Sequence, residues 1–414
     1  MRQFIFTFFL LLLFFCECAD RKGENPGSNS QIPVIAYEGV PTQRWTFPDY
    51  SLQQSYKDLA DAGFTANIAL DISFHRGNPS PEQYFKTLDV AQSNGIKLFV
   101  SSEAILNFSP EDRQRLISHP ALAAYRIYDE PWVEKYDSIG EIVRRVQAID
   151  TMHPCYVNQF GMWEAAYPGH LRQFIEKVPV PQLSYDVYPV VLKKDGSRGV
   201  QAGFYHSLEL FSREAKRIGK PFWAFALCFT HFDYPVPTLA DLRLQVYSNL
   251  AYGAQAITYY SYWSLPLEFD WTKEENYGPI GRDGKKTDIY YTVQAMNREI
   301  KALSRVFLNA NMIWTAYSGN VPDGCKALKD VTLPAAIKSV EIADNHDALI
   351  SYMEKDDGRF LIIVNQNLNK PSMQAALTGN AKIYRIFKDA SELLDDGKMQ
   401  TVEAGDALIY YWNL

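Results

Sequence analysis

The sequence predicts an α/β fold in which a (β/α)8 TIM barrel is followed by a small C-terminal antiparallel β-sandwich. Between residues 33 and 261, eight short apolar runs alternate with longer stretches of helical periodicity. From residue 313 the pattern changes to short alternating strands with tight turns. A doubly wound open sheet is the alternative, but the strand count of eight and the lack of a Gly-rich phosphate turn favour the barrel.

Several of the eight barrel strands are predicted from continuous apolar runs, which are typical of a parallel sheet buried on both faces. They cover residues 33–37, 65–70, 97–101, 123–128, 155–159, 182–185, 222–227 and 256–261. Helical spacing of apolar residues predicts helices over 51–62, 81–93, 137–149, 204–218 and 239–251. A further helix over 290–307 leads out of the barrel. We therefore expect the barrel domain over residues 32–312.

The C-terminal region is predicted to form a domain of about 100 residues, over residues 313–414. Its strand candidates cover 348–353, 360–364, 381–387 and 406–412, and Asp357-Gly358 suits a tight turn. In a TIM barrel the chemistry lies at the carboxyl ends of the strands, so this second domain is not expected to supply a catalytic acid.

The N-terminus is predicted to be a targeting segment. Arg2 precedes an almost wholly apolar run over residues 4–15, which is typical of a signal peptide and too short for a stop-transfer helix. Cys16 and Cys18 follow, and a cysteine at this point is similar to a bacterial lipoprotein acylation site. We expect a lipoprotein signal over residues 1–18, a flexible tether over 19–31 and anchoring to the outer membrane by the lipid. Plain cleavage and secretion is the alternative.

Composition and motifs exclude several function classes. The net charge is −7, so the chain lacks the excess of positive charge that is typical of nucleic-acid-binding proteins. The three remaining cysteines, Cys155, Cys228 and Cys325, indicate no disulfide framework, and the histidines show no metal-ligand spacing. No metal and no cofactor is expected. Aromatic residues make up 14% of the chain, which fits a large core and also a cleft that stacks rings against sugars.

Side chains at the predicted strand ends combine carboxylates, amides and aromatic rings. Because active sites of this fold lie on that face, these residues are the site candidates. They are Tyr37 and Glu38, Glu103, Asp129 and Glu130, Asn158, Asp186 and Tyr188, and Trp263 and Glu268. Cleavage of a glycosidic bond needs such a set: an acid for the leaving oxygen, a second carboxylate, amides for hydroxyl groups and rings for the sugar face.

The stretch Tyr128-Asp129-Glu130-Pro131 at the end of the fourth strand resembles that of clan-A glycoside hydrolases, in which Asn-Glu-Pro ends this strand. The resemblance implies that Glu130 is the general acid/base and that Asp129 replaces the amide beside it. The alternative is that Asp-Glu-Pro only caps the start of a helix. Further stretches, such as Tyr185-Asp186-Val187-Tyr188-Pro189 and Tyr262-Trp263, are similar to barrels resembling the family 42 β-galactosidases.

The seventh strand departs from this pattern. Clan-A enzymes carry their nucleophilic Glu at its end, whereas residues 222–228 contain no carboxylate. Asp186, then Glu103, then Glu268 are the substitutes that we rank for this role. A separation of about 5–5.5 Å between the two carboxyls would indicate a covalent intermediate, and about 6.5–9.5 Å an attacking water.

These observations predict an exported glycoside hydrolase with Glu130 and Asp186 as its catalytic residues and a carbohydrate as its substrate. Asp129, Tyr188 and Trp263, with the remaining strand-end candidates, are expected to bind the sugar. Two alternatives stay open: a non-catalytic carbohydrate-binding protein on a degenerate barrel, and a polysaccharide lyase that uses a tyrosine and an acid.

Overall fold

The computed structural model describes residues 31–42, 51–69, 79–161, 167–267, 272–369 and 372–413. The predicted signal peptide with Cys16 and Cys18, nearly all of the predicted tether, and Glu268 lie outside the described residues.

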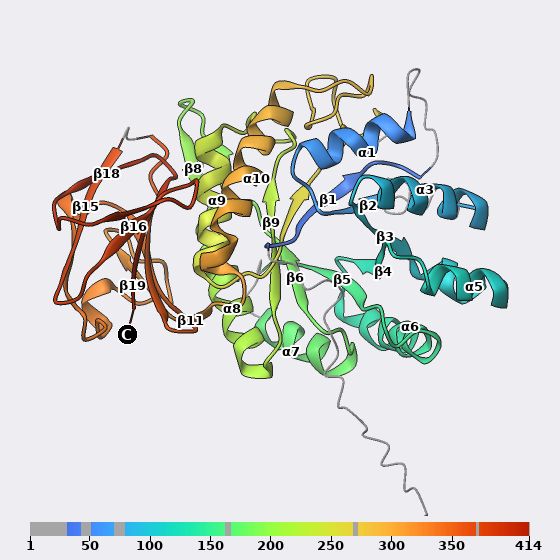
Figure 1. The fold of residues 1–414 in the computed structure, drawn as a ribbon, viewed down its shortest axis with the longest axis horizontal. Helices are drawn as coiled ribbons and strands as arrows, with labels where there is room; N and C mark the ends of the chain where they lie inside the picture. Colours follow the sequence, from blue (N-terminus) through green and yellow to red (C-terminus); the bar gives the residue numbers. More distant parts are fainter. Residues whose placement is uncertain are drawn as a thin grey trace, which may run out of the picture.

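Eight parallel strands close into a barrel, which confirms the predicted fold class (Figure 1). The strands are β1 (Val34–Gly39), β2 (Ala66–Ala69), β3 (Lys97–Ser101), β4 (Leu122–Asp129), β5 (Cys155–Phe160), β6 (Leu183–Asp186), β9 (Phe222–Leu227) and β10 (Ile257–Tyr260). Around the barrel they follow the order β1-β10-β9-β6-β5-β4-β3-β2. Each therefore pairs with its predecessor and successor, and β10 closes the ring against β1.

Helices surround the barrel (Figure 1). They are α1 (Leu52–Asp61), α3 (Pro81–Ser93), α4 (Ser102–Asn107), α5 (Pro110–Ile117), α6 (Tyr136–Ile149), α7 (Tyr167–Lys177), α8 (Ala202–Ile218), α9 (Leu239–Ala251) and α10 (Asp288–Phe307). Local signals explain their ends. Ser80 and Gln83 form a capping box at the start of α3, and Gly219 ends α8 at a φ of +64°, which glycine adopts without strain.

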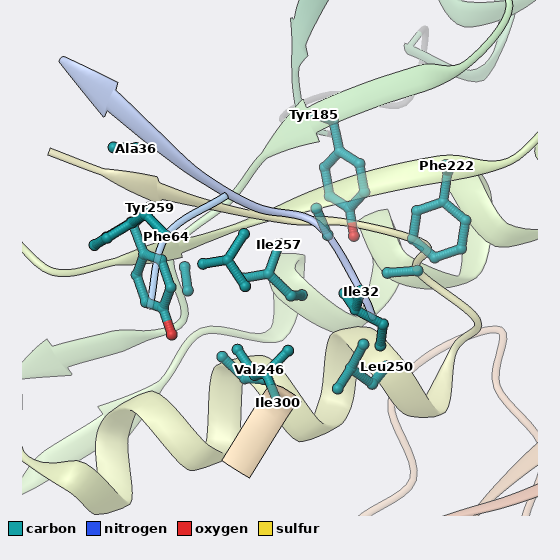
Figure 2. Close-up of a cluster of buried hydrophobic side chains, with 14 of the residues drawn as sticks. Ile32, Ala36, Phe64, Tyr185, Phe222, Val246, Leu250, Ile257, Tyr259 and Ile300 are labelled. Atoms are coloured by element: carbon teal, nitrogen blue, oxygen red, sulfur yellow. The ribbon is translucent and has the colours of Figure 1, made fainter. Parts of the chain in front are cut away.

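Alternation along each barrel strand divides the core into two layers. On β1, Ile35 and Tyr37 face the barrel interior, whereas Val34 and Ala36 belong to the layer between the strands and the helices. Figure 2 shows part of the outer layer, where Ile257 on β10 lies near Val246 and Leu250 of α9. The larger apolar area therefore lies outside the barrel, where it holds the helices in place.

Two antiparallel sheets follow the barrel. The larger runs in the order β11 (Asn311–Ser318), β13 (Ala348–Lys355), β14 (Gly358–Asn365), β19 (Ala407–Asn413), β16 (Tyr384–Ile386) and β17 (Glu392–Leu394). The smaller contains β12 (Ile337–Ile342), β15 (Ser372–Gly379) and β18 (Gln400–Glu403). An apolar cluster that includes Leu361, Leu377 and Trp412 is buried between them.

The sandwich lies beside α8 and α9 in Figure 1. Contacts join the two regions: Ser351 donates to the carbonyl of Ala251 at 2.6 Å, and Arg243 of α9 pairs with Asp406 at 3.4 Å. Leu349, Ile362 and other residues of the larger sheet also belong to the same apolar cluster as the barrel.

Some elements were not predicted from the sequence. A hairpin, β7 (Val190–Leu192) and β8 (Arg198–Val200), follows β6, and α4, α5 and α7 are additional helices. The strands β11, β12, β15, β17 and β18 were also missed. β17 and β18 are only three and four residues long, and so short a strand shows little periodicity. Among the described helices, none is both long and apolar enough to cross a membrane.

Candidate active site

Two strand ends at the mouth of the barrel have unusual backbone geometry. Glu38 on β1 and Glu130 directly after β4 each have a φ of +46°, in the left-handed region that costs a non-glycine residue about 1–2 kcal/mol. The pairing of β1 with β2 shifts register between Ala36 and Gly39, and that of β4 with β5 shifts between Arg126 and Tyr128. Such irregularities redirect side chains and are frequent beside active sites.

The carboxyl groups of Glu130 and Asp186 lie close together, and each shifts the pKa of the other. Glu130 is an exposed residue at the mouth, but barrel atoms crowd its carboxyl. This desolvation raises the pKa of Glu130, and the nearby Asp129 charge raises it further, while the Asp186 carboxyl acts in the opposite direction. Desolvation and the charges of Glu130 and Asp129 raise the pKa of Asp186 well above its usual value. The protonation of the two carboxyls is therefore linked.

A buried chain of hydrogen bonds holds Asp186 in place. The Asn158 amide donates to Asp186 Oδ1 at 2.7 Å, and Asn158 Oδ1 accepts from the Ser184 hydroxyl at 3.0 Å. Since Ser184 donates to Asn158, its 3.0 Å contact with the Tyr156 hydroxyl is one in which the tyrosine donates. Every member of the chain is thus oriented, and the amide of Asn158 presents its N–H group to Asp186.

A second charged group lies beside this pair. Arg126, which is 5% exposed, approaches Asp129 at 3.7 Å and donates to the Tyr37 hydroxyl at 3.0 Å. The guanidinium neutralises part of the negative charge at the mouth. Asp129 is the last residue of β4 and directly precedes Glu130.

Two tyrosines form an aromatic platform at the mouth. The rings of Tyr188 and Tyr260 stack with centroids 6.0 Å apart and an interplanar angle of 20°. Both residues are partly exposed. Burial of the phenol groups raises the pKa of both tyrosines, and the charges of Asp186, Glu130 and Asp129 raise it further. Tyr260 was not among the predicted site residues. Tyr260 is the last residue of the eighth barrel strand, and this position in the sequence could have identified it as a site candidate.

The other predicted site residues lie at varied depths. Asn158 is 2% exposed, Glu38 is 3% exposed and Trp263 is 2% exposed. The backbone N–H of Trp263 donates to the Glu38 carbonyl at 2.9 Å. Glu103 is exposed in the first turn of α4, after β3. The predicted binding roles of these residues stay predictions.

The carboxyl end of the seventh barrel strand, β9, is apolar. Leu227, Cys228 and Phe229 are buried there. His231 follows, and burial lowers its pKa to about 4, so its imidazole is neutral at neutral pH. In the part of the chain that the structure describes, no group of three or more His, Cys, Asp or Glu residues could hold a metal ion.

Asp186 lies close enough to Glu130 for each carboxyl to shift the pKa of the other. The predicted role of Asp186 as nucleophile or base stays a prediction.

The closed barrel with C-terminal antiparallel sheets and carboxyl groups at its mouth has the architecture of a glycoside hydrolase-like TIM barrel. No protein-family model matches the chain, and no curated protein does. Among solved structures, a family 39 glycoside hydrolase from the gut symbiont Bacteroides cellulosilyticus matches with a TM-score of 0.50 and 10% identity, over 93% of this chain and 82% of that one.

Two further structures are similar at lower scores. An α-L-arabinofuranosidase from Thermotoga maritima has a TM-score of 0.49 and 10% identity, over 93% of this chain and 96% of that one. A β-galactosidase from the Antarctic haloarchaeon Halorubrum lacusprofundi has a TM-score of 0.44 and 12% identity, over 65% of this chain, and the match spans 58% of that protein. At these identities the likeness concerns the fold.

Proposed function

We propose that this protein is an exported glycoside hydrolase in which Glu130 protonates the leaving oxygen of an O-glycosidic bond. The observation that carries the proposal is the pair of crowded carboxyl groups of Glu130 and Asp186 at the mouth of the barrel, where burial raises the pKa of both. A general acid needs a raised pKa, and a crowded site with a like charge nearby raises it.

The surroundings of the pair suit a carbohydrate. The stacked rings of Tyr188 and Tyr260 offer a flat apolar surface beside the acid. Asn158, Arg126 and Asp129 supply amide, guanidinium and carboxylate groups of the kinds that bind hydroxyl groups. In the proposed reaction the glycosidic C–O bond breaks, its electron pair stays on the leaving oxygen, and that oxygen takes a proton from the carboxyl pair. A water molecule supplies the hydroxyl group that ends on the anomeric carbon, and its other proton returns to the pair.

The test is a panel of 4-nitrophenyl and 2,4-dinitrophenyl glycosides of common hexoses and pentoses, each as both anomers, together with plant and host polysaccharides. Glu130→Gln keeps the shape and removes the acid, so hydrolysis of substrates with poor leaving groups should fall by about 10²- to 10⁴-fold. Dinitrophenyl glycosides need little protonation and should be affected less. Glu134→Gln, on an exposed residue of the same loop, is the matched control.

Several results would overturn the proposal. Full activity of Glu130→Gln on the true substrate would show that Glu130 is not the general acid. Saturable sugar binding without any cleavage would identify a carbohydrate-binding protein, and an unsaturated product that absorbs ultraviolet light would identify a lyase.

The proposed location rests on the N-terminal residues alone. The apolar run over residues 4–15 followed by Cys16 and Cys18 supports export and anchoring to the outer membrane by a lipid. Growth on radioactive palmitate should label the protein, and Cys16→Ala and Cys18→Ala variants would identify the acylated cysteine. Release of an unlabelled protein into the medium would contradict the anchor.

A further inference from the structure

Around the barrel, β1 is as far from β4, the strand that precedes Glu130, as the seventh barrel strand, β9, is. In the order β1-β10-β9-β6-β5-β4-β3-β2, β1 lies three places from β4 in one direction and β9 lies three places from it in the other. A carboxylate at the end of β1 can therefore face Glu130 across the mouth, as the nucleophile of clan-A enzymes does from the seventh strand. This inference rests on the proposed function.

Glu38 occupies that end of β1. It is 3% exposed, and its φ of +46° lies within the register shift between Ala36 and Gly39. The negative charge of Glu38 acts on Tyr37, Arg126 and Tyr260. Arg126 donates to the Tyr37 hydroxyl at 3.0 Å and approaches Asp129 at 3.7 Å, so Glu38 belongs to the same group of charged and phenolic side chains as Asp129.

Tyr260 connects the two sides. Four carboxyl groups act on its phenol, Glu38 most strongly, followed by Asp129, Asp186 and Glu130. Asp186 lies close to Glu130, and Asp129 is the last residue of β4, directly before Glu130. Glu38 is the member of the four that comes from a wall of the barrel away from β4 and β6.

We propose that Glu38 is the second catalytic carboxylate, the nucleophile that attacks the anomeric carbon opposite the leaving group. A Glu38 oxygen forms a bond to the anomeric carbon while the glycosidic C–O bond breaks, and the leaving oxygen takes the proton held by Glu130 and Asp186. A water molecule then attacks the glycosyl ester, gives one proton back to the pair and releases Glu38 as a carboxylate. The sugar product keeps the anomeric configuration of the substrate.

The positive φ of Glu38 suggests a substitution that should leave the fold intact. Glycine adopts this φ without strain, so Glu38→Gly should remove the carboxylate at little cost to folding. On the 2,4-dinitrophenyl glycoside that the wild type cleaves best, Glu38→Gly should lose on the order of 10³-fold or more in kcat. Added azide should restore turnover and give a glycosyl azide of the anomeric configuration opposite to that of the substrate, because the azide attacks from the vacated side.

The matched control is Glu214→Gln. Glu214 is a glutamate buried to a similar degree, 1% exposed, but it lies on α8 and pairs with Arg217. It should keep the wild-type kcat. A wild-type rate in Glu38→Gly, or a folded but inactive Glu38→Gly that azide does not reactivate, would overturn the proposal for Glu38 while the proposed function stands. A wild type that cleaves no glycoside would instead overturn the proposed function, and the role of Glu38 with it.

Discussion

At the scale of single residues, the raised pKa of Asp186 costs stability at neutral pH. In the unfolded chain an aspartic acid titrates near a pKa of about 3.9, whereas the folded protein holds the pKa of Asp186 well above that value. Between the two values the folded protein binds more protons than the unfolded chain. The free energy of unfolding therefore falls as the pH rises through this window.

The first prediction concerns Asp186→Asn. This variant removes the titrating group, so its Tm should exceed that of the wild type at pH 7 by roughly 2 °C or more and should equal it near pH 3. Thermal melts at a series of pH values measure the effect. A Tm difference that is independent of pH would contradict the raised pKa.

At the scale of elements, the site depends on how neighbouring strands are paired. Asp129 on β4 lies opposite Asn158 on β5, and Phe160 on β5 lies opposite Asp186 on β6. This register brings the amide of Asn158 to Asp186 and the hydroxyl of Ser184 to Asn158. The chain of hydrogen bonds thus uses the barrel itself as a rigid support for the acid pair.

The second prediction tests this support. Ser184→Ala removes the donor to Asn158 and leaves two buried polar atoms without their partner, so the free energy of unfolding should fall by about 1–3 kcal/mol. The amide of Asn158 is then no longer held toward Asp186, and the pH–rate profile should shift. Ser212→Ala, which removes a buried hydroxyl bonded to the Tyr252 carbonyl, serves as control. It should lose stability with an unchanged pH profile, and a shift of equal size in both variants would argue against a positioning role.

At the scale of the whole molecule, the sandwich is held against the barrel by close contact as well as by ion pairs. A Cβ atom at Gly405 would lie 2.1 Å from the carbonyl oxygen of Ala240 in α9. Arg243 of α9 pairs with Glu299 of α10 and with Asp406 of the sandwich, and Lys388 pairs with the same aspartate at 2.6 Å. The helix that packs on β9 therefore also contacts the sandwich.

The third prediction uses two glycines of the sandwich with nearly equal backbone geometry. Gly405 has a φ of +71° and Gly397 a φ of +70°, but a Cβ at Gly397 would meet only atoms at 3.7 Å or beyond. Both substitutions by alanine carry a backbone cost of about 1 kcal/mol. Gly405→Ala should cost about 1–3 kcal/mol more, because the added methyl group clashes with α9. Urea unfolding measures the difference. Equal losses in the free energy of unfolding would show that α9 shifts to accommodate the methyl group at Gly405 without cost.

The sequence by itself determined the eight barrel strands, most of the helices and the presence of carboxyl groups at the strand ends. The strands at 97–101 and 222–227 have the predicted bounds, and the others differ by a few residues at their ends. This succeeds because apolar alternation and helix-stop signals are local properties of the chain. The same patterns identified Glu130, Asp186, Asn158 and Tyr188 as strand-end residues, although their roles stay predictions.

Only the tertiary structure decided which of these groups meet. The proximity of Glu130 and Asp186 depends on the register of β4, β5 and β6. The ring beside them is Tyr260 at the end of β10, whereas Trp263, which the sequence favoured, is buried three residues later. Both outcomes follow from pairing between residues far apart in the chain and from local register shifts. Hydrophobic periodicity counts positions along one strand, and it carries no information on how two strands are aligned.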